Sequence, residues 1–150
     1  GSIGRYNSNL GRGTFGTVFN NSLQLYYYDA QQGNLRHAWA DSRGWHFENL
    51  EGDAGSISGY NSDIGIGGSI TVYNGSLQLY YHDATKGNLR HGWAGSNGWN
   101  FENLDGDQGS VSMYSSNLGQ YSTVTVLNNM IQLYYQDAAN GDLRHAWFLP

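Results

Sequence analysis

The sequence predicts an all-β protein built from three copies of one antiparallel sheet. Three observations carry this prediction: a segment recurs every 54 residues, glycine and aromatic residues are abundant, and short apolar runs alternate with polar turns. The repeats span residues 1–54, 55–108 and 109–150, so the chain is a single repeat domain. With 22 glycines, one proline and 15% aromatic residues, the composition favours many short strands over helices.

The recurring segment is LQLYYYDAQQGNLRHAW at residues 23–39, which returns in slightly altered form at 77–93 and 131–147. Two runs rich in aliphatic and aromatic residues flank a turn that contains Gly33, a pattern typical of a β-hairpin. Along the first run, side chains on both sides of the expected strand are apolar or aromatic. We therefore expect this strand to lie between two neighbouring layers.

Each repeat contains further strand-like runs. The run TFGTVF at 14–19 ends in an asparagine turn that leads into the recurring segment, and WHFENLEG at 45–52 follows it. Each repeat is therefore expected to form a meander of four strands, and residues 1–13 a long polar connection. The third repeat lacks a counterpart of the fourth run.

The composition excludes several function classes. A net charge of −5 without a basic cluster argues against nucleic-acid binding. No apolar run is long enough to suggest insertion into a membrane, and no cysteine is present to form disulfides or thiolate metal sites. No cofactor is expected.

Four antiparallel strands repeated at this spacing favour the blades of a β-propeller, with a β-trefoil as the alternative. The succession LQLYYYD, GNLRHAW and GWHFENLEGD resembles the blades of bacterial propeller lectins of the Photorhabdus type. It is more loosely similar to the Aleuria-type fucose-binding propellers, whose second-strand arginine is replaced here by Gln24, Gln78 and Gln132. The resemblance implies a secreted or surface-acting lectin that binds fucose or O-methylated glycans at several sites between blades.

A sugar site needs an aromatic ring for stacking and a few fixed polar groups for hydrogen bonds. Tryptophan, arginine and glutamate recur at the same positions of the repeats, near the expected strand ends. Most of these aromatic side chains could instead pack between sheets, and Arg36 could pair with Glu48 on the adjacent strand. The candidate sugar-binding residues are Trp39, Trp93, Trp45, Trp99, Arg36, Arg90, Glu48 and Glu102.

Two other classes of function remain as alternatives. A non-catalytic structural or designed repeat scaffold would need no ligand. A glycosidase would need two carboxylates in different environments at one site, whereas the carboxylates here occur as repeated copies. The repeated His37, His91 and His145 are expected to form structural hydrogen bonds rather than a metal site, because one imidazole per repeat does not converge on one ion.

The repeat number also predicts association. Closed propellers have about four to eight blades, and three blades leave two apolar faces open to water. We expect a homo-oligomer, most simply a twofold dimer that closes a six-bladed ring. Residues 1–6 are expected to latch onto the unpaired edge of the partner's third blade.

Overall fold

The structure, a computed structural model, describes residues 7–149 and contains eleven strands and no helix in that range. The first sheet, sheet 1, contains β1 (Leu10–Phe19), β2 (Ser22–Asp29), β3 (Asn34–Asp41) and β4 (Gly44–Glu51). Sheet 2 contains β5 (Ile64–Tyr73), β6 (Ser76–Asp83), β7 (Asn88–Gly95) and β8 (Gly98–Asp105). Sheet 3 contains β9 (Leu118–Leu127), β10 (Met130–Asp137) and β11 (Asp142–Phe148).

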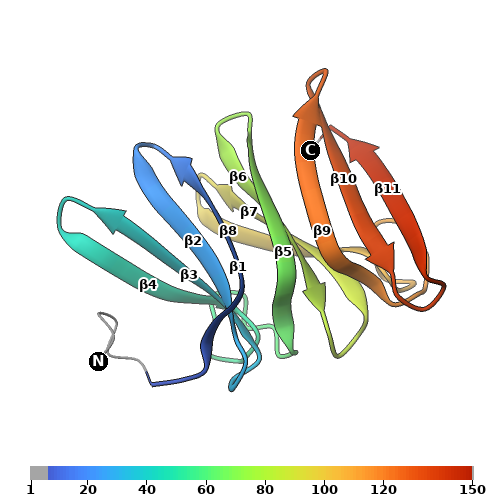
Figure 1. Cartoon of the computed structure of the whole chain (residues 1–150), viewed down its shortest axis with the longest axis horizontal. Helices are drawn as coiled ribbons and strands as arrows, with labels where there is room; N and C mark the ends of the chain where they lie inside the picture. The colour runs from blue at the N-terminus through green and yellow to red at the C-terminus, as the bar shows by residue number, and fades with distance from the viewer. Residues whose placement is uncertain (1–6, 150) are drawn as a thin grey trace.

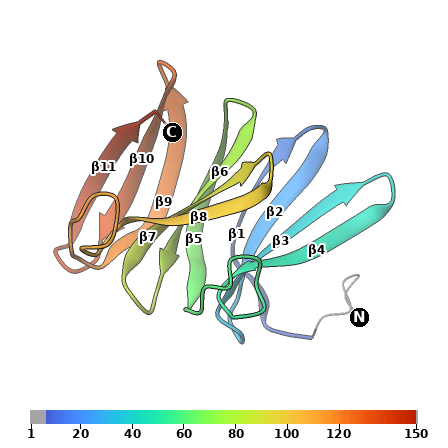
Figure 2. The same ribbon diagram turned by 180° about the vertical axis from the view of Figure 1, so that it is seen from behind.

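Each sheet is an antiparallel meander in chain order, as the sequence predicts. The three sheets lie side by side, with sheet 2 between the other two (Figures 1 and 2). The first strands of the sheets are neighbours: β1 contacts β5, and β5 contacts β9. The all-β, blade-like repeat architecture is therefore confirmed, including the three-stranded third sheet.

The first hairpin of every sheet closes through two residues in the left-handed region. In sheet 1 these are Asn20 and Asn21, with φ of 50° and 58°, and in sheet 2 they are Asn74 and Gly75, with φ of 48° and 73°. Positive φ at both central residues gives a turn whose twist matches that of the flanking strands, and asparagine and glycine adopt it most easily. The predicted asparagine turns are confirmed.

The first strand begins earlier than the sequence suggests. β1 starts at Leu10, inside the passage expected to be a connection, because two bulges accommodate its glycine-rich start. The register against β2 shifts between Leu10 and Arg12 and again between Arg12 and Phe15, and Gly11 and Gly13 have positive φ. The bulges break the alternation that would have revealed the strand.

Alternation along the strands gives each sheet two distinct faces. We call one the tyrosine–histidine face; it carries Tyr26, Leu35 and His37 in sheet 1, Tyr80, Leu89 and His91 in sheet 2, and Tyr134, Leu143 and His145 in sheet 3. We call the other the leucine face; it carries Leu23, Leu25 and Tyr27, then Leu77, Leu79 and Tyr81, then Ile131, Leu133 and Tyr135.

The core consists of two contacts between unlike faces. Tyr26 and Leu35 of sheet 1 pack with Leu77, Leu79 and Tyr81 of sheet 2. In the same way, the tyrosine–histidine face of sheet 2 packs on the leucine face of sheet 3 through Tyr80, Leu89, Ile131, Leu133 and Tyr135. Within residues 7–149, only sheet 2 has another sheet packed on each of its faces, and its strand β6 is buried from Leu77 to Asp83.

Buried polar contacts repeat at both junctions. Tyr81 donates its hydroxyl hydrogen to Glu51 Oε2 at 2.7 Å, and Tyr135 donates to Asp105 Oδ2 at 2.6 Å. Arg90 binds both carboxylate oxygens of the fully buried Glu51. Burial alone lowers the pKa of Arg90, but the hydrogen bonds and negative charge of Glu51 outweigh it and raise the pKa.

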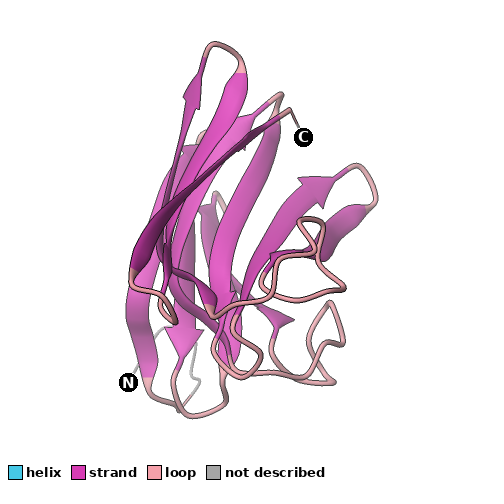
Figure 3. Ribbon diagram, turned by 90° about the vertical axis from the view of Figure 1, so that its right-hand side faces the viewer, coloured by secondary structure: helices cyan, strands magenta, loops and turns pink. Residues whose placement is uncertain are grey.

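The chain passes from one sheet to the next through long loops gathered at one end of the strands (Figure 3). In the first loop Asp53 accepts hydrogen bonds from Asn34 Nδ2 at 2.6 Å, Asn49 Nδ2 at 3.1 Å and the Gly55 amide at 2.8 Å. Chiefly through the bond from Asn34, these contacts lower the pKa of Asp53.

A depressed folded-state pKa means that the Asp53 carboxylate stabilises the fold above its unfolded pKa and that this contribution is lost as pH falls through the folded value. We therefore expect Asp53→Asn to lower the free energy of unfolding at pH 7 by more than it does at pH 3. Urea unfolding of both proteins at several pH values measures the difference. A loss that stays constant across this range would contradict the assignment.

The expected latch at residues 1–6 lies outside the described residues. Between residues 7 and 149, no helix is long and apolar enough to cross a membrane.

Candidate functional site

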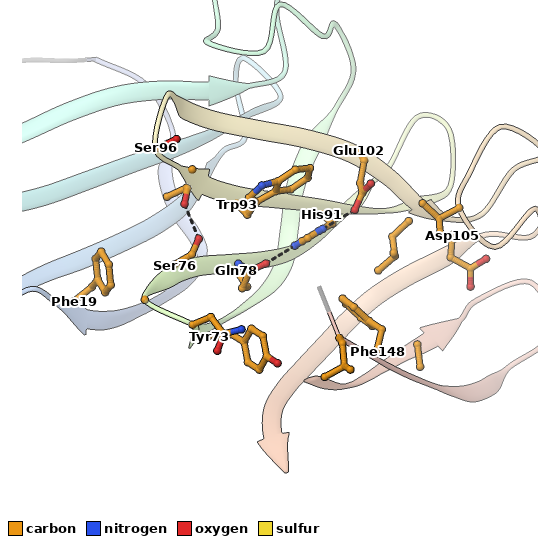
Figure 4. A pocket seen from close by; sticks show the side chains of 18 of the residues that line it. Phe19, Tyr73, Ser76, Gln78, His91, Trp93, Ser96, Glu102, Asp105 and Phe148 are labelled. Atoms are coloured by element: carbon orange, nitrogen blue, oxygen red, sulfur yellow. Dashed lines mark hydrogen bonds and ion pairs between the residues drawn. The ribbon is translucent and has the colours of Figure 1, made fainter. Parts of the chain in front are cut away.

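A cavity of about 1120 Å³ lies between sheets 2 and 3 (Figure 4). Sheet 2 contributes the end of the β5–β6 hairpin together with β7 and β8, and sheet 3 contributes Tyr135 of β10 and the end of β11. The β1–β2 hairpin of sheet 1 borders the cavity through Phe19 and Asn20. The residues that define its chemistry are Tyr73, Gln78, Trp93, Glu102, Phe148 and Leu149.

The cavity occupies a place that a tryptophan fills at the other junction. Between sheets 1 and 2, the Trp99 ring from β8 packs edge-on against Tyr26 and His37, with ring centroids 6.0 and 5.8 Å apart. Its indole Nε1–H donates to Glu48 Oε1 at 3.0 Å. Sheet 3 has no fourth strand among the described residues, so it supplies no counterpart of this side chain.

Phe148 takes over only part of the role of Trp99. Its ring packs edge-on against Tyr80 and His91, with centroids 6.1 and 6.3 Å apart, which closely matches the Trp99 geometry. A phenyl ring has no N–H group, however, so Glu102 lacks the donor that Glu48 has. The Glu102 side chain is 37% exposed, compared with 25% for Glu48.

A hydrogen-bonded row fixes the polar wall of the cavity. His91 Nδ1 lies 2.8 Å from Glu102 Oε1, and His91 Nε2 lies 2.8 Å from Gln78 Oε1 (Figure 4). The His91 ring stacks between Tyr80 and Trp93, at centroid distances of 4.8 and 4.9 Å. Because His91 Nδ1 donates to only one carboxylate oxygen, Glu102 keeps acceptor capacity toward the cavity.

Asp105 and Tyr135 also line the cavity, but their polar groups serve the fold. Asp105 accepts hydrogen bonds from Ser112 Oγ, the Gly106 amide at 3.0 Å and Tyr135 at 2.6 Å. Burial, together with this bond, raises the pKa of Tyr135 to about 12, so its phenol stays protonated. Glu102 is therefore the carboxylate that faces the cavity with acceptor capacity to spare.

The sequence-predicted residues fall into separate groups. Trp93 and Glu102 meet at the cavity, and Glu48 meets Trp99 across the first junction. Trp39 stacks between His37 and His46. Trp45 and Arg36 lie on the leucine face of sheet 1, away from Trp39 and Glu48.

Arg90, one of the expected polar partners of the sugar, lies at the junction between sheets 1 and 2 and does not line the cavity. Arg90 binds Glu51 and Asn103 and lies over the Tyr60 ring, 4.1 Å from its centroid. It borders a smaller groove of about 530 Å³, while its Nε and Nη2 bind Glu51 across the junction and its Nη1 binds Asn103 within sheet 2. In sheet 1 the strand register places Glu48 opposite His37, whose Nδ1 lies 2.6 Å from Glu48 Oε1. Glu48 of β4 therefore pairs with His37 of β3, and the structure does not form the alternative pair between Arg36 and Glu48.

The repeated histidines are hydrogen-bonded in all three sheets, as expected. His37, His91 and His145 each bond a glutamine that lies diagonally across on the neighbouring strand, two residues from the directly opposite tyrosine, at 2.8, 2.8 and 2.9 Å. Within residues 7–149, no group of three or more histidine, aspartate or glutamate side chains is arranged to hold a metal ion.

Sequence reasoning missed Tyr73, Gln78 and Phe148 as cavity residues. Gln78 stands out only as the residue replacing the arginine of the fucose-binding blades. Phe148 stands where the other repeats have Ala40 and Ala94. That change of size was the visible signal for a different arrangement at the third sheet.

In comparisons with known proteins, no family model matches the sequence and no curated protein matches it.

Proposed function

We propose that the chain is a carbohydrate-binding protein whose sheets act as propeller blades and whose sugar site is the cavity between sheets 2 and 3. The observation that carries the proposal is the unmatched acceptor of Glu102 beside an open aromatic wall. A ligand that replaces the missing indole must combine a flat apolar surface with a hydroxyl or N–H donor. A pyranose ring has both: a C–H face for stacking and hydroxyl groups for hydrogen bonds.

The lining suits this chemistry. Trp93, Tyr73 and Phe148 provide aromatic surface, and Gln78 and Glu102 provide polar groups held in place by His91. L-fucose and O-methylated sugars are the favoured ligands, because their methyl groups add apolar surface that Phe148 and Leu149 would cover. The proposal places one such site in each chain, so multivalency would come from association of chains.

Removing the Glu102 charge tests the site. Glu102→Gln should weaken glycan binding about tenfold to hundredfold, because a hydrogen bond to a charged group contributes roughly 1.5–3 kcal/mol. The 150-residue chain is first screened on a glycan array that includes L-fucose and O-methylated sugars. Affinities for the best glycan are then measured by calorimetry.

The fold provides a matched control in Glu48→Gln, since Glu48 occupies the same position at the junction that Trp99 fills. This variant should bind glycan as the parent does. In the same way, Trp93→Ala should abolish stacking while Trp39→Ala leaves binding intact, with thermal unfolding used to confirm that each variant is folded. Absence of binding anywhere on the array, or equal losses for Glu102→Gln and Glu48→Gln, would refute this site.

A further inference from the structure

We propose that the uncovered face of sheet 3 binds the uncovered face of sheet 1 of a second copy of this chain, and that two such contacts close a ring of six sheets. This inference is independent of sugar binding. It rests on which side chains are buried at the two junctions inside the chain and on where the same side chains lie exposed.

The tyrosine–histidine face is covered in two sheets and bare in the third. Leu35 and Leu89 are 0% exposed, whereas their counterpart Leu143 is 78% exposed. Trp147, the counterpart of the half-buried Trp39 and Trp93, is 62% exposed. Sheet 3 therefore presents to solvent the type of surface that sheets 1 and 2 bury.

The leucine face shows the reverse pattern. Leu77 is 4% exposed and Ile131 is 0% exposed, whereas their counterpart Leu23 in sheet 1 is 42% exposed. Trp45 and Phe47 lie exposed on this face, although their counterparts Trp99 and Phe101 pack against the first core cluster. Sheet 1 therefore presents the surface that the bare face of sheet 3 would require.

The two bare faces are of the unlike kinds that pack together at both internal junctions. A sheet 3 and a sheet 1 from different chains can therefore repeat an existing contact without forming a new type of interface. Following the first junction, the Trp45 indole of one copy would pack edge-on against Tyr134 and His145 of the other, as Trp99 does against Tyr26 and His37.

The contacts from sheet to sheet are similar at the two junctions. The edge-on ring contacts to the tyrosine are 6.0 Å for Tyr26–Trp99 and 6.1 Å for Tyr80–Phe148, and those to the histidine are 5.8 and 6.3 Å. The hydrogen bonds from Tyr81 and Tyr135 to the preceding sheet are 2.7 and 2.6 Å long. A head-to-tail contact repeated from chain to chain gives a ring when its rotation closes and an open filament when it does not, and closed propellers have about four to eight blades. Two copies of three sheets give six, within that range.

Light scattering after gel filtration tests the association. At micromolar concentration the chain should elute with twice the monomer mass of 16.6 kDa. Leu143→Lys and, separately, Leu23→Lys should each raise the dimer dissociation constant by on the order of a hundredfold, since each places a charge in a closed apolar contact. Both residues are exposed in the single chain, so the monomer should remain folded.

Met113→Lys is the control variant, because it adds the same charge at a 66% exposed apolar side chain in the loop between sheets 2 and 3. It should leave the dimer intact. Tryptophan emission gives a second readout: dilution of the parent should shift it to longer wavelength as Trp45 and Trp147 become solvated, and Leu143→Lys should show that shift at every concentration. A monomeric parent, a series of open oligomers, or a dimer unaffected by both lysine variants would overturn the proposal.

Discussion

Replacing Arg90 by leucine is expected to lower the free energy of unfolding by about 3–5 kcal/mol, the cost of removing one partner from a buried ion pair. Glu51 is fully buried, and Arg90 binds both of its carboxylate oxygens from the adjacent sheet. Without Arg90, the Glu51 carboxylate would retain the Tyr81 hydroxyl as its side-chain donor in the described structure. Urea unfolding followed by tryptophan fluorescence, at fixed protein concentration, measures the loss.

The equivalent arginine at the second junction provides the control. Arg144 Nε lies 3.6 Å from Asp105 Oδ2, and its side chain is 32% exposed, so Arg144→Leu should cost only about 1 kcal/mol. Asp105 keeps its bonds from Tyr135, Ser112 and the Gly106 amide. A double variant that also replaces Glu51 by leucine should recover part of the stability lost in Arg90→Leu. Equal losses for the two arginines would contradict this account of the first junction.

Gly52→Ala is the second change expected to have a large effect. Gly52 has a φ of +129°, and a Cβ atom there would lie 2.5 Å from Asn34 Oδ1, 2.6 Å from Gly33 O and 2.7 Å from Asn34 Cα. Two of these three atoms belong to the backbone, so the collision cannot be relieved by turning a side chain. The alanine variant should lose about 1–3 kcal/mol through backbone strain and a similar amount through overpacking.

Gly44→Ala separates these two contributions. Gly44 has a similar φ of +117°, but no atom lies within 4 Å of the Cβ position. It should therefore show the strain cost without the collision, and the difference between the variants isolates the close approach at Gly52. The Gly52 amide also donates to Tyr60 O at 3.1 Å, where the chain leaves sheet 1 for sheet 2. If both variants unfold at the same urea concentration, the close approach contributes nothing to stability.

The proposed sugar site and the proposed ring have one consequence in common. Each chain contributes one cavity between sheets 2 and 3, so a two-chain ring would carry two equivalent sites. Binding to a surface that displays many glycans would then be stronger than binding to a single glycan, and Leu143→Lys would remove that gain without changing the affinity of each site.

The sequence by itself determined the local structure of the repeats. The 54-residue period, the alternation in LQLYY and the asparagine turns together specify antiparallel meanders and the number of strands in each. The register between the third and fourth strands differs by one residue from the pairing of Arg36 with Glu48 considered from the sequence, because the structure sets His37 opposite Glu48 and His91 opposite Glu102. The bulged start of β1 escaped detection because Gly11 and Gly13 interrupt the alternation on which such predictions depend.

Only the tertiary structure decided which copy of each repeated residue is buried. The sequence LRH occurs three times, yet its leucine is buried as Leu35 and Leu89 and open to solvent as Leu143. Burial depends on the sheet that stands opposite, and that neighbour lies far along the chain or, as we propose, in another copy. The cavity beside Glu102 arises for the same reason. The strand that carries Glu102 fixes the face on which its side chain lies, but the side chain that packs against that face comes from the next sheet.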